Sequence, residues 1–260
     1  MPPATTRTPN LKPTKICAVL TGQFNLPIEI DLAAVFLFGV TGGLTALKRG
    51  YDVIGLFALT FVTALGGALI RDGIFIQQGP PALTTDSRYL IMVLVAGLVA
   101  FLFRGQVTGI NRVKTWLDTL GQGAQFLRDR VIRFNKVIAW LDALGLGAYA
   151  VVGVQKSLNA GMSLAAAVLV GVINAAGGGL LRDVLVRDEP LMFKPGQFYV
   201  LAAFAGCVLF ELLALQFKME ATKAAGIAIG ATFVFRILAI QFNWKSASLW
   251  QEPPAPPPAT

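Results

Sequence analysis

The sequence predicts an all-α membrane protein with seven transmembrane helices, organised as two inverted three-helix repeats plus a seventh helix. Three observations support this fold class: the chain is strongly apolar, its apolar segments have spanning length, and one long stretch occurs twice. Of the 260 residues, 55% are hydrophobic and 14% are charged, and the mean hydropathy is +0.66. Because about a quarter of the residues of a soluble domain are charged, the composition indicates a chain that lies in lipid.

The apolar segments predict helices rather than strands. Within lipid only α-helices and closed β-barrels satisfy all backbone hydrogen bonds, and these segments lack the alternation of barrel strands. Seven of them approach the roughly 20 residues that a spanning helix needs. They are residues 28–47, 53–76, 89–103, 137–158, 164–186, 198–217 and 224–242.

The predicted helices divide the chain into six parts. These are an N-terminal tail (1–27), a first three-helix repeat (28–103), a connection (104–136), a second repeat (137–217), a seventh helix (218–243) and a proline-rich tail (244–260). The connection mixes apolar and basic side chains around "GQG". That pattern fits an interfacial amphipathic segment that attracts anionic lipid, and it fits a solvated basic loop equally well.

The composition also excludes several function classes. The chain has no histidine, and its two cysteines, Cys17 and Cys207, are far apart, so neither a disulfide framework nor a metal site is expected. We find no nucleophile–base pair that would indicate an enzyme, and no cofactor is expected. The net charge of +8 is taken as a signal of membrane topology rather than of nucleic-acid binding.

The positions of lysine and arginine predict the orientation in the membrane. Cytoplasmic loops carry an excess of these residues. With the N-terminus outside, twelve basic residues fall on the cytoplasmic side and seven on the other side. We therefore expect a multi-pass protein of the plasma (inner) membrane with its N-terminus outside and its C-terminus in the cytoplasm.

The repeat is defined by two similar motifs, "GGALIRD" at positions 66–72 and "GGGLLRD" at positions 177–183. The offset between these motifs also relates Asp31 to Asp142, Gly42 to Gly153 and Gly50 to Gly161, and we call it the repeat offset. Each repeat contains three predicted helices, an odd number, so the second repeat enters the membrane from the opposite side. Inverted repeats are typical of proteins that move solutes, with the pathway at the repeat interface.

The glycine pairs Gly66–Gly67 and Gly177–Gly178 predict weak points in the second helix of each repeat. Glycine costs about 1 kcal/mol relative to alanine inside a helix, and adjacent glycines favour a kink or unwinding. A broken helix is tolerated in lipid only where it lines a cavity or lies within protein. The alternative is that the glycines form a close-packing surface between helices.

The charged motif residues Arg71, Asp72, Arg182 and Asp183 lie in predicted spans, where ionisable residues are functional candidates. Adjacent residues on a helix do not face each other. We therefore expect each arginine to pair elsewhere, for example Arg71 with Asp183. The alternative for an arginine near a helix end is that it reaches toward the membrane surface.

Other polar residues give weaker signals. Thr63 and Asn174 precede the two glycine pairs at equivalent positions and either face the pathway or bond neighbouring helices. Asp31 and Asp142 are expected to begin their helices, where they would cap the helix and favour its dipole. The remaining candidates for lining or gating a pathway are single charges, namely Lys156, Glu211 and Arg236.

The two repeat units, from "DLAAVFLFGVTGG" to "GGALIRD" and from "DALGLGAYAVVG" to "GGGLLRD", resemble the tandem domains of the prokaryotic trimeric intracellular cation channel (TRIC) family. These domains are also described as glycine-transporter domains, and the resemblance covers residues 31–242. It implies a homotrimer in which each protomer holds its own pore for potassium or other monovalent cations. It further implies that helices two and five kink at Gly66, Gly67, Gly177 and Gly178 and surround that pore.

Two function classes therefore remain. The resemblance favours a passive cation channel, although Arg71 and Arg182 would repel cations unless their aspartates neutralise them. A secondary transporter of glycine or another small amino acid is the alternative, because inverted repeats with broken helices suit a carrier equally well.

Overall fold

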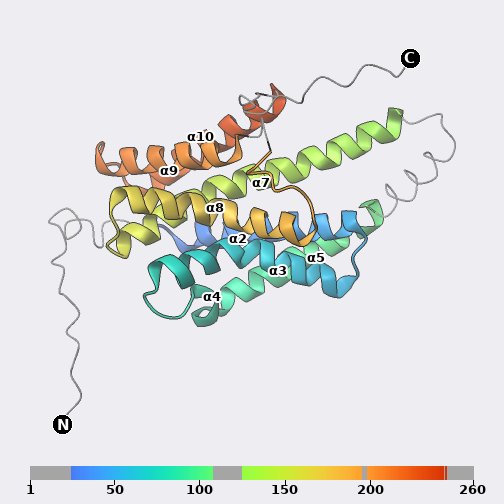
Figure 1. Cartoon of the computed structure of the whole chain (residues 1–260), viewed down its shortest axis with the longest axis horizontal. Helices are drawn as coiled ribbons and strands as arrows, with labels where there is room; N and C mark the ends of the chain where they lie inside the picture. The colour runs from blue at the N-terminus through green and yellow to red at the C-terminus, as the bar shows by residue number, and fades with distance from the viewer. Residues whose placement is uncertain (1–24, 108–124, 195–197, 243, 245–260) are drawn as a thin grey trace, which may run out of the picture.

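The computed structural model of the protein describes residues 25–107, 125–194, 198–242 and 244 (Figure 1). In these ranges the regular elements are helices. They are α2 (Ile28–Arg49), α3 (Val53–Ile70), the π-helix η1 (Arg71–Ile76), the short α4 (Ala82–Thr85), α5 (Ser87–Leu102), α7 (Gln125–Asn159), α8 (Leu164–Leu185), α9 (Tyr199–Leu215) and α10 (Ala221–Gln241). Nearly all of the N-terminal tail and of the proline-rich C-terminal tail lies outside the described residues.

The helices confirm an all-α membrane protein. Five of the described helical stretches are long and apolar enough to cross a bilayer: α2, α3 with η1, α7 from Phe134, α8 and α10. The apolar helices α5 and α9 are shorter. Large apolar side chains are exposed on the outside of the bundle, for example Ile54 on α3 and Leu102 on α5. Exposed apolar surface of this kind is stable in contact with lipid.

Local sequence signals account for several helix ends. The Asp52 carboxylate accepts a hydrogen bond from the Gly55 amide (2.8 Å) at the start of α3, and the Ser163 hydroxyl accepts one from the Ala166 amide (3.4 Å) at the start of α8. Such caps satisfy backbone amides that have no partner within the helix. Gly50, after α2, has a φ of 74°, a left-handed conformation that glycine adopts readily.

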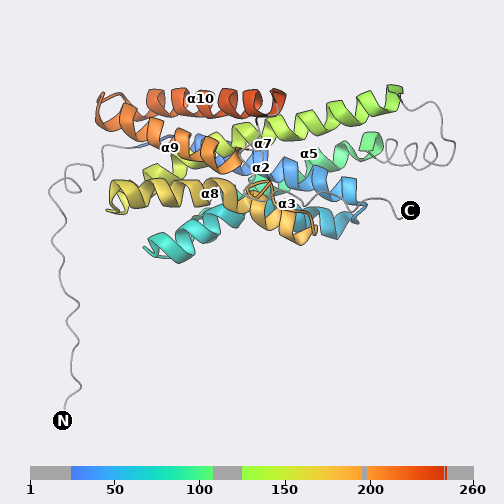
Figure 2. The same ribbon diagram turned by 45° about the horizontal axis from the view of Figure 1, so that its top comes forward.

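The helices pack as two groups that meet along a shared core. Helix α2 contacts α3 and α5, while α7 contacts α8, α9 and α10. The groups meet where α2 lies against α7 and α3 lies against α8, as Figures 1 and 2 both show. At this junction the rings of Phe38 on α2 and Tyr149 on α7 lie 5.2 Å apart between centroids. The buried core therefore joins the two halves of the chain.

Helices α2 and α7 are antiparallel. At one end the Lys48 ammonium donates a hydrogen bond to Asn135 Oδ1 (2.8 Å), joining the end of α2 to an early turn of α7. At the other end the Lys156 ammonium donates to Asp31 Oδ2 (2.6 Å), joining the last turn of α7 to the first turn of α2. The first helices of the two predicted repeats thus run in opposite directions.

Two predicted elements differ from the structure. Helix α7 begins at Gln125 rather than at residue 137, so the second part of the predicted connection is helical. Hydropathy marks only the part of a helix suited to lipid, whereas the hydrogen bonds of a helix allow it to continue beyond that part. Residues 108–124 of the connection lie outside the described residues. The segment predicted as one helix over 53–76 is α-helical only to Ile70 and then π-helical.

Candidate functional site: the glycine crossing and two charged clusters

Helices α3 and α8 cross at their glycine pairs. A Cβ atom added to Gly67 would collide with the backbone oxygen of Asn174, and one added to Gly178 would collide with the backbone oxygen of Thr63. The two contacts are reciprocal, because the repeat offset relates Gly67 to Gly178 and Thr63 to Asn174. Only glycine allows the two backbones to approach this closely.

The first glycine of each pair, Gly66 or Gly177, also lies close to the opposite helix, though less closely than the second. A Cβ atom on Gly66 would lie 2.6 Å from the Leu181 side chain, and one on Gly177 would lie 3.1 Å from the Gly67 Cα atom. Both helices continue as α-helix through their glycine pairs. The α-helices are therefore not interrupted at these glycines, which make the close contact that the packing alternative describes, and the kink at these positions stays a prediction. The physical reason for the close contact is that the neighbouring backbone occupies the space that the missing side chains leave.

Thr63 and Asn174 are fully buried beside this crossing. The Thr63 hydroxyl donates to the Leu59 backbone oxygen within its own helix (2.6 Å). The Asn174 amide donates to the Tyr149 backbone oxygen (2.7 Å) and accepts a hydrogen bond from Arg71 Nη1 (3.4 Å). In this conformation Asn174 connects three helices, and Thr63 bonds its own.

Each motif arginine pairs with the aspartate next to it. Arg71 Nε donates to Asp72 Oδ1 at 2.6 Å, and Arg182 Nε donates to Asp183 Oδ1 at 2.9 Å. The expected pairing of Arg71 with Asp183 is therefore wrong. An arginine side chain is long enough for its guanidinium to reach the carboxylate of the next residue, even though the Cβ atoms of adjacent helical residues point in different directions. Because α3 and α8 run antiparallel (Figure 1), the two motifs also lie on opposite sides of the crossing.

The aspartates of both motifs also hold the chain that follows. Asp72 Oδ2 accepts a hydrogen bond from the Ala82 amide (3.3 Å), and Asp183 Oδ2 accepts one from the Leu191 amide (3.1 Å). Their backbone oxygens accept from the amides of Gln77 (3.0 Å) and Asp188 (2.9 Å), two positions that the repeat offset also relates. Each motif therefore fixes both its arginine and the loop after its helix.

A first cluster of charges surrounds Asp31 and consists of Asp31, Arg71, Asp72, Tyr89 and Lys156. The buried Asp31 carboxylate accepts hydrogen bonds from the Tyr89 hydroxyl and the Lys156 ammonium, both at 2.6 Å. Arg71, whose side chain is 0% exposed, interacts electrostatically with Asp31. Asp31 lies in the first turn of α2, as expected. It does not cap that helix, whose N-cap is Pro27 without a side-chain hydrogen bond, because its carboxylate bonds to other helices instead.

A second cluster lies across the crossing and consists of Asp142, Arg182, Asp183, Tyr199 and Arg236. Arg182 Nη1 donates to Asp142 Oδ1 at 3.1 Å and to the Thr41 hydroxyl at 3.3 Å. The Arg236 guanidinium lies over the Tyr199 ring, 4.9 Å from its centroid. The expectation that Asp142 begins a helix is wrong, because Asp142 lies well inside α7, which starts at Gln125.

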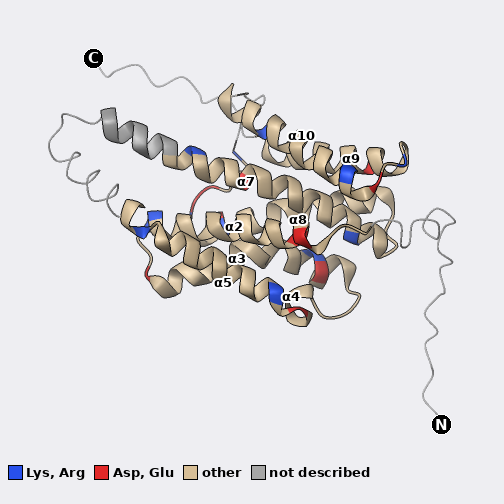
Figure 3. Ribbon diagram, turned by 180° about the vertical axis from the view of Figure 1, so that it is seen from behind, with Lys and Arg blue, Asp and Glu red and all other residues tan. Residues whose placement is uncertain are grey.

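Each cluster contains two acidic and two basic residues. Figure 3 shows such charges as isolated coloured segments on otherwise uncharged helices, including adjoining acidic and basic segments near α8. Isolated charges are costly in lipid, and paired charges are tolerated. The aspartates therefore neutralise Arg71 and Arg182, which removes the electrostatic objection to cations near them. The repeat comparison does not reveal the tyrosines, because the offset from Tyr89 to Tyr199 is one position shorter than the repeat offset.

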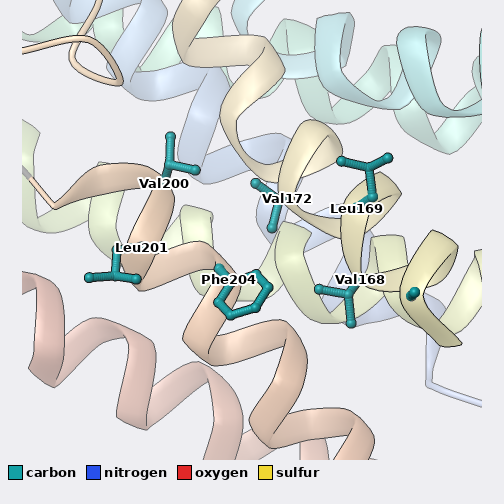
Figure 4. A pocket seen from close by; sticks show the side chains of 7 residues that line it. Val168, Leu169, Val172, Val200, Leu201 and Phe204 are labelled. Atoms are coloured by element: carbon teal, nitrogen blue, oxygen red, sulfur yellow. The ribbon is translucent and has the colours of Figure 1, made fainter.

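A groove between α8 and α9 has a volume of about 480 Å³ (Figure 4). Its lining consists of apolar side chains, namely Ala165, Val168, Leu169, Val172, Val200, Leu201 and Phe204. It offers an ion no polar side chain. Glu211 lies half-buried on α9 outside both clusters. Within the described ranges no group of three or more histidine, cysteine, aspartate or glutamate side chains is placed to hold a metal ion.

Apolar helices around two buried, charge-balanced clusters define a polytopic helical membrane protein with polar groups inside its bundle. The chain belongs to the family described as "Glycine transporter", whose model matches residues 29–105 and again residues 139–214. The double match coincides with the two copies of the repeated sequence.

Individual relatives agree with this assignment. A UPF0126 membrane protein of Deinococcus radiodurans is 28% identical over 222 residues, which cover 85% of this chain and 87% of that protein. The TRIC trimeric intracellular cation channel orthologue from Rhodobacter sphaeroides has a similar structure, with 27% identity and a TM-score of 0.67 over 83% of this chain and 97% of its own. A second TRIC cation channel has 26% identity and a TM-score of 0.69 over 88% of this chain and 100% of its own. The predicted resemblance to TRIC channels is confirmed.

Proposed function

We propose that the protein is a monovalent cation channel that conducts potassium through one pore in each protomer. The observation that carries the proposal is the arrangement of two charge-balanced clusters on opposite sides of a glycine crossing, in a chain whose structure resembles TRIC cation channels. A cation moving from one charged cluster to the other through the glycine crossing would meet carboxylate and phenol oxygens on both sides of the crossing. At the crossing itself the two backbones are in contact.

The pathway follows from a seven-helix arrangement in which the second three-helix repeat is inverted relative to the first. The antiparallel contacts of α2 with α7 and the double family match support this arrangement. Cysteine labelling at positions 48 and 156 tests it, because Lys48 and Lys156 lie at opposite ends of the bundle. Labelling of both positions from the same side would contradict the inverted arrangement.

In this proposal the structure corresponds to a closed conformation, and the glycine crossing is the constriction. Separation of Gly66 and Gly67 from Gly177 and Gly178 would break close approaches between the two backbones and would also move the Leu181 side chain away from Gly66. A kink at the glycines is one way to achieve it, because glycine weakens a helix. Thr63 and Asn174 would then flank the opened route. Lys156, Glu211 and Arg236 remain candidates for lining or gating it.

The proposal also covers the oligomeric state of the protein and its orientation in the membrane. We expect a homotrimer, as the names of the related channels state for those proteins. The excess of lysine and arginine on one side supports a cytoplasmic C-terminus for a protein of the plasma (inner) membrane. The basic segment 104–136 is a candidate contact for anionic lipid, each basic residue contributing about 1 kcal/mol.

A secondary transporter of glycine or another small amino acid is the second candidate, favoured by the description of the matching family. A carrier binds its substrate at the repeat interface and exposes it alternately to each side. The charged clusters would then hold the carboxylate and ammonium groups of an amino acid instead of passing cations.

Recording from purified protein in a planar bilayer distinguishes the two candidates. Unitary potassium currents that persist in the absence of glycine support the channel. Saturable uptake of labelled glycine into vesicles, without unitary currents, would overturn the channel proposal and support the carrier. A Gly67→Val variant serves as the loss-of-function control. Its added side chain would meet the backbone of α8, so it should reduce the potassium current or the glycine uptake, whichever the protein shows.

A further inference from the structure

Helix α10 has no counterpart in the repeated sequence, yet glycines on two other helices position it closely. A Cβ atom on Gly206 of α9 would collide with the Thr232 hydroxyl, and one on Gly147 of α7 would lie 3.2 Å from the Thr232 Cβ atom. Arg236 follows Thr232 by about one helical turn. The docking of Thr232 therefore determines where the Arg236 side chain lies.

Arg236 is an unusual residue for this position. Its exposed fraction is 2%, and it is the one charged residue of α10 beyond the first helical turn. A buried cation in a membrane helix is costly unless acidic groups or rings compensate it. Two groups of the second cluster offset part of this cost, since the Arg236 guanidinium lies 4.9 Å from the Tyr199 ring centroid and interacts electrostatically with Asp142.

The first cluster contains a basic side chain in a comparable place. The Lys156 ammonium lies 5.7 Å from the ring centroid of Tyr89 and pairs with Asp31. Tyr89 and Tyr199 both lie at or near the start of the third helix of their repeat, and the repeat offset relates Asp31 to Asp142. A cation therefore lies over a tyrosine ring beside an aspartate on each side of the crossing, although the two cations come from unrelated helices.

We propose that Arg236 is a charge-balancing residue that sets how strongly the second cluster attracts cations. Without Arg236 that cluster has two carboxylates and a single arginine, and therefore a net negative charge. Arg236 thus limits the cation preference of the half of the pathway that contains Asp142. This inference rests on the proposed function, because a cation preference is measurable only if the protein conducts.

The experiment compares Arg236→Gln with Arg236→Lys and with Lys223→Gln, an exposed basic residue of the same helix whose side chain is 74% exposed. The measurement is the reversal potential in a potassium chloride gradient, which reports the ratio of cation to anion permeability. Arg236→Gln removes a buried unit positive charge from the second cluster, so it should raise the ratio of cation to anion permeability about tenfold. Arg236→Lys and Lys223→Gln should keep the ratio of the unaltered protein.

A combined variant tests whether the effect acts through Asp142. Arg236→Gln together with Asp142→Asn restores neutrality, so its permeability ratio should return to that of the unaltered protein. An unchanged ratio in Arg236→Gln, in a protein that conducts potassium normally, would overturn the inference while leaving the proposed function intact. A lack of potassium current in the unaltered protein would instead refute the proposed function.

Thermal unfolding in detergent tests the pairing without any need for conduction. If Arg236 balances Asp142, the loss of melting temperature in the double variant should be smaller than the sum of the two single losses. Additive losses would overturn the pairing. This measurement also remains decisive if Arg236→Gln folds too poorly for recording, because rescue of folded protein by Asp142→Asn is then the expected result.

Discussion

The first and second clusters contain the same chemical groups but obtain them from different parts of the fold. Each contains an Arg-Asp motif, an aspartate from the first helix of a repeat and a tyrosine near the start of the third. The fourth charge differs. Lys156 comes from α7, which belongs to the other repeat, whereas Arg236 comes from α10 outside both repeats. The comparison indicates that neutrality inside the membrane constrains each cluster more strongly than the origin of its residues does.

The helices that carry the two motifs also end differently. After Ile70 the chain becomes π-helical over η1, whereas α8 remains α-helical to Leu185. The residue after each motif differs accordingly, with Gly73 in the first copy and Val184 in the second. Glycine stabilises a regular α-helix less than most residues do, so the segment after the first motif more readily adopts the wider π-helical turn of η1. The aspartate carboxylates of both motifs nevertheless hold equivalent downstream loops.

The largest expected effect is the loss of a motif arginine. Arg182→Met leaves the buried Asp142 and Asp183 carboxylates without their ion-pair partner, and Arg71→Met does the same to the part-buried Asp72 carboxylate. Each substitution should lower the free energy of unfolding by about 4 kcal/mol. Denaturant unfolding in detergent measures both. Near-equal losses of unfolding free energy would support the equivalence of the two clusters. A loss under about 1 kcal/mol at either site, which is typical of an exposed ion pair, would contradict that equivalence.

The glycine crossing should show a slightly smaller and equally symmetric effect. Gly67→Ala and Gly178→Ala each place a methyl group against backbone of the opposite helix, with an expected destabilisation of about 3 kcal/mol. Gly226→Ala is the control, because a Cβ atom there meets nothing within 4 Å. The control should be neutral or stabilising, since alanine favours the helix. Tolerance of alanine at Gly67 or Gly178 would show that the crossing is loose.

The Lys156–Asp31 pair should contribute less than the arginine pairs, because the Lys156 side chain is 28% exposed. Lys156→Met and Asp31→Asn should each destabilise the protein, and the double variant should recover about 1 kcal/mol relative to the sum. A double-mutant cycle by thermal unfolding measures this coupling. The Arg236–Asp142 cycle described above is its counterpart, so unequal couplings would measure how far the two clusters differ.

The smallest effect concerns an ion pair outside the bundle, between Arg49 at the end of α2 and Asp188 in the loop after α8. The hydrogen bond from Arg49 lowers the pKa of the Asp188 carboxyl below its usual range. The associated stability is therefore present above the unfolded pKa of about 4 and is lost as the pH falls through the lower folded value. Both side chains are well exposed to solvent, so the loss should stay below about 1 kcal/mol.

Unfolding midpoints from roughly pH 5 to pH 2 measure this contribution. Asp188→Asn should remove this part of the pH dependence. A variant whose pH profile matches that of the unaltered protein would show that the pair contributes nothing.

Several site contacts could not be predicted because they depend on side-chain reach and helix crossing. The pairing of Arg71 with its own neighbour follows from the length of the arginine side chain, which Cβ geometry does not describe. The role of Asp31 depends on Tyr89 and Lys156, which lie 58 and 125 residues away along the chain. No local pattern brings these residues together.

The sequence by itself determined the class of protein, the positions of the apolar helices and the duplicated motifs. Hydropathy and a constant offset are local or linear properties, so they can be read from the sequence without the tertiary structure. Only the tertiary structure decided that the glycine pairs meet as a close contact and that the charges form two neutral clusters. The physical reason is that burial and pairing of charges depend on which helices are neighbours, and the packing of the whole bundle determines those neighbours.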